Sequence, residues 1–66
     1  MSREIEILNF IRAFIAENTY PPTYQEIAEG VGVSKGAGVT RPLAALKREG
    51  LIDYEKGRYG SLRVTQ

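Results

Sequence analysis

The basic side chains are the groups in this sequence best suited to do chemistry, and the chemistry they offer is anion binding. The 66 residues include nine Lys or Arg but neither cysteine nor histidine. Imidazole catalysis, thiolate chemistry and the common Cys/His metal sites are therefore excluded for these residues. The adjacent pair Ser34-Lys35 could form a nucleophile and base, but it lies in a glycine-rich stretch and has no third orienting group. We expect no enzyme activity, no catalytic residue, no cofactor and no metal.

The charges are distributed unevenly along the chain. Residues 1–33 carry two basic and five acidic side chains, whereas residues 34–66 carry seven basic and three acidic ones. This asymmetry favours a surface in the second half that faces a polyanion, although ordinary solvated faces produce similar counts by chance.

A predicted helix that ends before Gly50 bears much of this positive charge. Its apolar residues Val39, Leu43 and Leu46 recur at i, i+4 and i+7 and should face inward. The opposite face combines small residues, which permit close approach to base edges in the major groove, with cations that reach guanine acceptors and phosphates. The residues expected on this face and its flanks are Thr40, Arg41, Ala44, Ala45, Lys47 and Arg48. A solvated surface with no ligand is the alternative.

The start of this helix depends on Pro42, which has no backbone donor. A start at Val39 or Thr40, with Thr40 as a reasonable cap, places the proline in the first turn. A start at Ala37 requires a kink at Pro42, and the sequence does not choose between the two.

Two further helices are predicted to support this one. Residues 3–17 have one wide apolar face, with Ser2 as the cap and Asn18 as the left-handed residue at the end. Thr23-Tyr24-Gln25-Glu26 is a capping box for a short helix that ends at Gly30-Val31-Gly32. Ala28 followed by Gly32 is typical of a helix-turn-helix with a turn one residue longer than the minimal form. Simple termination of a packed helix explains the pair as well.

The remaining residues predict a β-hairpin. Leu51 to Glu55 and Leu62 to Thr65 alternate in polarity across a glycine-bearing segment. The expected tip contains Lys56, Arg58 and Tyr59. These residues are suited to contact a DNA phosphate backbone, but an ordinary turn explains the segment equally well. The expected fold is α+β, a three-helix winged helix-turn-helix with a C-terminal two-stranded hairpin, formed by residues 1–66 as a single domain.

Three segments of the sequence resemble the N-terminal DNA-binding domain of LexA-type repressors. They are residues 7–12 (ILNFIR), residues 20–28 with their Tyr-Pro-Pro-Thr and Glu-Ile-Ala motifs, and residues 43–52 (LAALKREGLI). The resemblance implies operator recognition by the third helix with the wing on the DNA backbone. It assigns DNA contact to Lys35, Ala37, Gly38, Thr40, Arg41 and Arg48.

The sequence departs from that family in residues 35–42, where the family typically has a Ser-Pro-Asn start followed by Ala and Glu. The family's operator sequence is therefore not carried over. The family's self-cleaving Ser/Lys domain has no counterpart in these residues, so we expect no autoproteolysis from them.

The expected partner is double-stranded DNA, with a homodimer formed on DNA or through sequence not present here. No segment fits a signal peptide or membrane span, so we expect a cytoplasmic, nucleoid-associated protein without a membrane partner. The alternative is a winged-helix adaptor for another protein, which would dock through the third helix or the open side of the first helix.

Overall fold

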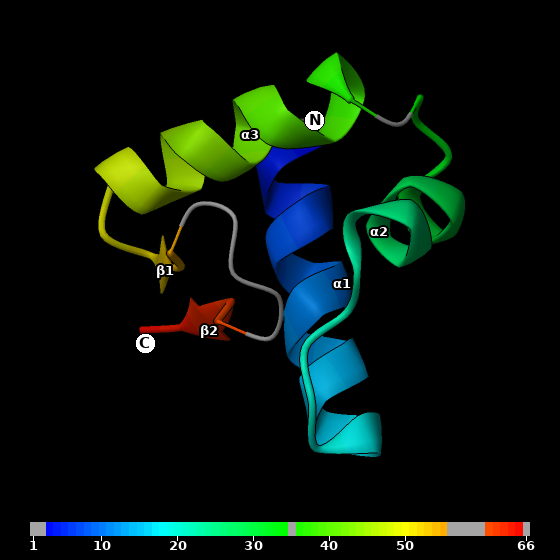
Figure 1. Ribbon diagram of the computed structural model, residues 1–66, viewed down its shortest axis with the longest axis vertical. Coiled ribbons are helices and arrows are strands. Elements are labelled where there is room, and N and C mark those ends of the chain that lie inside the picture. Colours follow the sequence, from blue (N-terminus) through cyan, green and yellow to red (C-terminus); the bar gives the residue numbers. More distant parts are fainter. Residues whose placement is uncertain (1–2, 35, 56–60, 66) are drawn as a thin grey trace.

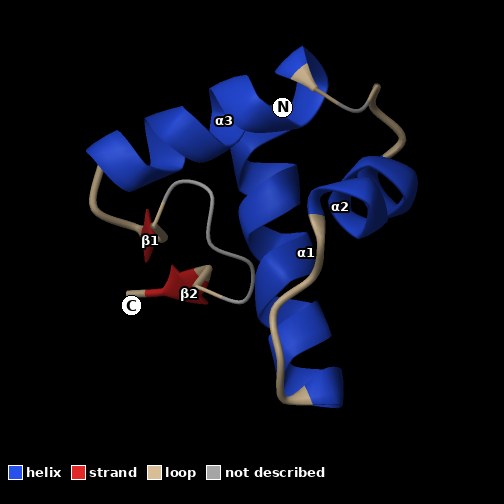
Figure 2. Cartoon of the chain, viewed as in Figure 1, coloured by secondary structure: helices blue, strands red, loops and turns tan. Residues whose placement is uncertain are grey.

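The computed structural model describes residues 3–34, 36–55 and 61–65, which form three helices followed by a small antiparallel sheet (Figures 1 and 2). Helix α3 crosses the N-terminal end of α1, while α2 and the sheet lie on either side of α1 in this view. The arrangement confirms the predicted α+β winged helix-turn-helix. The elements are α1 (Arg3–Asn18), α2 (Tyr24–Val31), α3 (Ala37–Arg48), β1 (Ile52–Asp53) and β2 (Arg63–Val64).

The two strands pair Ile52 with Val64 and Asp53 with Arg63, and each is two residues long. The longer strands predicted from the alternation are wrong, because at Glu55 a side-chain hydroxyl replaces the backbone carbonyl of the facing strand as acceptor. The Tyr54 amide donates to the Asp53 carboxylate (2.9 Å), and the Glu55 amide donates to the Ser61 hydroxyl (2.9 Å).

Helix α1 buries its predicted face, with Ile7, Leu8 and Ile11 in the core. Its end differs from the prediction, since Thr19 rather than Asn18 has the left-handed backbone (φ 63°). Asn18 stays helical, and its side-chain amide donates to the Phe14 carbonyl (3.0 Å). The predicted cap, Ser2, lies outside the described residues.

Helix α2 begins with the predicted capping box. The Glu26 amide donates to the Thr23 hydroxyl (3.1 Å), and the Thr23 amide donates to the Glu26 carboxylate (2.8 Å). Two orphan backbone donors are thereby satisfied, so the first turn of this short helix is fixed locally. The helix is eight residues long and ends at Val31, as its glycines predict.

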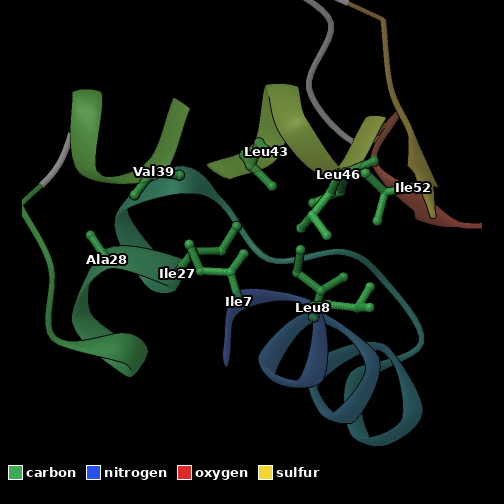
Figure 3. Packing of buried hydrophobic residues seen from close by; sticks show 10 residues of the cluster. Ile7, Leu8, Ile27, Ala28, Val39, Leu43, Leu46 and Ile52 are labelled. Atoms are coloured by element: carbon green, nitrogen blue, oxygen red, sulfur yellow. The ribbon is translucent and has the colours of Figure 1, made fainter. Parts of the chain in front are cut away.

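The core fixes the orientation of α3. Val39, Leu43 and Leu46 are fully buried and point toward α1 and α2 (Figure 3). Burial of each such side chain contributes about 1.5–3 kcal/mol, so rotating α3 to expose this stripe would cost several kcal/mol. Their neighbours in the core cluster are Ile7, Leu8, Ile11, Ile27, Ala28, Ile52 and Leu62.

Helices α1 and α2 come together where Gly30 faces the ring of Phe10. A Cβ atom built on Gly30 would overlap that ring and lie 2.6 Å from its Cζ atom. Glycine suits this position because the two helices approach closely and a side chain would have to displace the Phe10 ring, and not because of an unusual backbone angle.

We expect Gly30→Ala to destabilise the protein by about 1–3 kcal/mol, because the added methyl group must displace the Phe10 ring. Urea unfolding measures the change. In a Phe10→Ala background the same substitution should be neutral or slightly stabilising, since alanine is the better helix former by about 1 kcal/mol. Equal destabilisation in both backgrounds would show that the ring is not the obstacle.

Candidate nucleic-acid interface

The side of α3 opposite the core carries small and cationic residues. Ala37, Arg41, Ala44 and Arg48 follow one another at intervals of four, three and four residues, which places them on one stripe, and all four are exposed. Thr40, beside this stripe, is exposed as well. Helices α1 and α2 and both strands lie on the other side of α3 in Figure 1. We call these five residues the outer face of α3.

The two arginines of the outer face have no hydrogen bond or ion pair with any of the described residues. Their guanidinium groups are therefore available to an external acceptor. A planar guanidinium donates in pairs to phosphate oxygens or to the O6 and N7 atoms of guanine, so the outer face has the donors that a duplex DNA site requires.

Helix α3 begins at Ala37, so the earlier of the two predicted starts is correct. Gly36 is the N-cap (φ 93°), and its carbonyl accepts from the amides of Val39 (2.9 Å) and Thr40 (2.7 Å). Thr40 is thus a helical residue and not the cap, and Pro42 lies inside the helix. This start lengthens the helix by two or three residues and brings Ala37 into line with Arg41.

The prediction that Ala45 belongs to the outward surface is wrong, because its side chain is only 7% exposed. At 100° per residue, Ala45 falls on the flank of α3 that also carries Gly38. Gly38 is half-buried against the preceding turn, and a Cβ atom there would lie 3.1 Å from the Ser34 hydroxyl and 3.3 Å from Cβ of Val33. This flank therefore packs against the protein itself.

Lys47, on the other flank of α3, contacts the start of the hairpin. Its ammonium donates to the Tyr54 carbonyl (2.7 Å) and lies 4.5 Å from the centre of the Tyr54 ring. Sequence reasoning missed this contact, because no periodicity rule relates a residue in the last turn of a helix to an aromatic seven positions later. The other predicted site residues, Lys35, Lys56, Arg58 and Tyr59, lie outside the described residues.

A second tyrosine lies near this contact. Partial burial raises the pKa of the Tyr24 hydroxyl above its usual value of 10.0, and the nearby Tyr54 phenol raises it further. Because an elevated pKa favours the protonated form, Tyr24 is a neutral hydrogen-bonding group at neutral pH. It adds no negative charge to this side of the molecule.

The turn between α2 and α3 has the geometry that the sequence predicted. Gly32 adopts a left-handed backbone (φ 81°), and the Ala28 carbonyl accepts from the amides of Gly32 (2.9 Å) and Val33 (3.0 Å). Ala28 is 6% exposed and lies beside Val39 in the core (Figure 3). Together with the outer face of α3 and the hairpin, this turn defines a winged helix-turn-helix domain of the DNA-binding class.

Comparison with known proteins identifies the family. Residues 1–59 match the model of the LexA DNA binding domain, and the chain belongs to this family. It is 47% identical over 53 residues to LexA repressor 1 of Geobacter sulfurreducens, which covers 80% of this chain and 26% of that protein. It is 38% identical over 64 residues to LexA repressor 2 of the same organism, and that match covers 97% of this chain and 32% of the relative. It is 44% identical over 62 residues to the LexA repressor of Clostridium novyi, and that match covers 94% of this chain and 30% of the relative.

The chain therefore spans about a third or less of the length of these relatives. Within the described residues, each helix is too short or too polar to cross a membrane.

We expect Gly32→Ala to destabilise the protein by about 1–2 kcal/mol, because a side chain disfavours the left-handed conformation. No atom lies within 4 Å of a Cβ built at Gly32, so steric overlap does not contribute. Asparagine tolerates this conformation better, and Gly32→Asn is the matched control. Thermal unfolding of both variants distinguishes them, and equal losses would contradict the conformational explanation.

Proposed function

We propose that this chain binds double-stranded DNA sequence-specifically as the DNA-binding domain of a LexA-like transcriptional repressor. The observation that carries the proposal is the outer face of α3, where Arg41 and Arg48 are exposed and unpaired among the described residues. Membership of the LexA DNA binding domain family supports it independently.

The dimensions of the outer face suit the major groove. The groove of B-DNA admits one α-helix, provided that small side chains let the backbone approach the base edges. Ala37 and Ala44 are small residues beside the two arginines. Arg41 and Arg48 are separated along the helix axis by about 10 Å, which is roughly three base-pair steps. The two arginines are therefore placed to contact different base pairs of one half-site.

The groups around the helix are assigned to the DNA backbone. Lys35 precedes α3, and the hairpin would act as the wing, with Lys56, Arg58 and Tyr59 near phosphates. Such contacts position a protein on the duplex but carry little sequence information. Gly38 lies in the first turn of α3, and we assign its main-chain amide to a contact with the DNA backbone.

One copy of so small a domain contacts few base pairs, so we infer that two copies bind adjacent half-sites. Dimerisation would occur on DNA or through further sequence. In this proposal residues 1–66 act as one domain in the cytoplasm, associated with the nucleoid, and bind DNA without catalysis or a cofactor.

The second candidate is a winged-helix adaptor for another protein. The observation in its favour is Ile5, which is 47% exposed on α1 near the exposed Asn9, Arg12 and Ala13. NMR shift mapping discriminates the two functions. Changes centred on residues 37–48 upon addition of duplex DNA support the repressor domain, whereas changes on α1 upon addition of a protein partner support the adaptor.

Selection of bound duplexes from a random pool is the most informative experiment on specificity. We expect a recurrent motif with two related half-sites, because a symmetric dimer on DNA requires a near-palindrome. Recovery of random sequences would contradict sequence-specific recognition.

The affinity for duplex DNA should fall steeply with salt, because phosphate contacts release condensed counterions. Fluorescence anisotropy at a series of salt concentrations measures the slope of log K against log salt. We expect a clearly negative slope of about −0.9 for each phosphate neutralised. Undetectable binding at low salt would refute the DNA-binding function.

Arg41→Ala and Arg48→Ala should each cost about 1–3 kcal/mol on the selected duplex and much less on random duplex, because a base contact is lost. Arg12→Ala removes the same charge from an exposed position on α1 and is the matched control. Lys56→Ala should weaken binding to all sequences alike. Equal losses on specific and random DNA for both α3 variants would show that these arginines do not read bases.

A further inference from the structure

The ammonium group of Lys47 lies among three acceptors at the start of the hairpin. Its Nζ atom donates to the Tyr54 carbonyl (2.7 Å), lies 4.5 Å from the centre of the Tyr54 ring, and is 3.9 Å from Oδ1 of Asp53. An ammonium has three donors and no acceptor. In Lys47 one donor makes a hydrogen bond, the Asp53 carboxylate lies at ion-pair distance, and the side chain stays 43% exposed. Lys47 differs in this respect from Arg41 and Arg48, which have no such partners among the described residues.

Asp53 extends this contact across both strands. Its Oδ1 atom accepts from the Tyr54 amide (2.9 Å), and its Oδ2 atom accepts from the Arg63 guanidinium (3.2 Å). Asp53 and Arg63 also face each other in the strand register. A single exposed ion pair is weak, but here one carboxylate connects the last turn of α3 to both strands of the hairpin.

Two contacts attach α3 to the hairpin. We call the contact of Lys47, which lies nearer to the hairpin tip, the outer attachment. The inner attachment is apolar, with Leu46 and Ile52 buried together and the Leu51 amide donating to the Leu46 carbonyl (3.0 Å). Tyr54 lies two residues beyond Ile52 in the direction of the hairpin tip. A hairpin held only at its base can pivot, whereas a second point of attachment fixes its direction.

We propose that Lys47 is a positioning residue that sets the angle between α3 and the wing, and that it is not a phosphate contact. This inference rests on the proposed function and replaces the assignment of Lys47 to DNA. A wing held at a fixed angle can meet the DNA backbone while α3 occupies the groove, and no ordering cost is then added on binding.

The first test uses the free protein and NMR spectroscopy. Lys47→Met keeps the aliphatic stem and removes the ammonium, so it should shift the Tyr54 carbonyl ¹³C resonance and speed exchange of the Tyr54 amide. Lys47→Arg retains donors and should restore slow exchange. Arg48→Met removes the same charge one residue away and should leave both Tyr54 signals unchanged. Unchanged Tyr54 signals in Lys47→Met would overturn the proposal.

The second test measures affinity for the duplex selected by the unmodified chain. Tyr54→Leu alters the attachment without changing any charge. If Lys47 positions the wing, Lys47→Met and Tyr54→Leu should each weaken binding about fivefold or more, and the double variant should bind no more weakly than the worse of the two, because both remove one interaction. If Lys47 contacts a phosphate, Tyr54→Leu binds normally while Lys47→Met lowers the salt slope by about 1. That result would overturn the proposal.

The two tests separate failure of this inference from failure of the proposed function. If the unmodified chain binds no duplex, the DNA-binding function fails, and with it the role of Lys47 in DNA binding. The Tyr54 signals of the free protein still decide whether Lys47 holds the hairpin. If the unmodified chain binds DNA and Tyr54→Leu binds equally well, only the positioning role fails.

Discussion

The burial of one stripe of α3 is the interaction on which the rest of this structure depends. Val39, Leu43 and Leu46 are fully buried against α1 and α2, and their burial stabilises the folded state by several kcal/mol. The opposite side of the same helix is consequently turned to solvent, where Arg41 and Arg48 lie exposed. The candidate DNA-binding surface is thus a consequence of core packing, because no contact between surface residues is needed to present it.

Small residues let the helices come close enough for this core to form. Gly30 leaves room for the Phe10 ring, Ala28 lies beside Val39, and Gly38 fits against the turn that precedes α3. A domain of this size buries a limited share of its surface, so a poorly packed helix contact cannot be compensated elsewhere. The small residues that let the domain fold therefore also help to determine how the outer face of α3 is presented.

The structure divides the four cations that it describes in the second half into two groups. Arg41 and Arg48 have no partner among the described residues, whereas Lys47 contacts Tyr54 and Asp53, and Arg63 pairs with Asp53 across the two strands. The net charge of this half counts both groups equally, so it overstates the charge that is free to meet a phosphate. Lys47 instead connects the hairpin to α3, and Arg63 connects the two strands to each other.

The sequence by itself determined the order of the elements, the capping box of α2, the glycine turn and the inward stripe of α3, because each depends on residues within a few positions of one another. It left the start of α3 open, and it misplaced Ala45, Asn18 and the ends of the strands. Those features depend on groups brought together by folding, such as the Ser61 hydroxyl that accepts from the Glu55 amide in place of a backbone carbonyl. The contact between Lys47 and Tyr54 is of the same kind, since only the tertiary structure brings the end of α3 beside the hairpin.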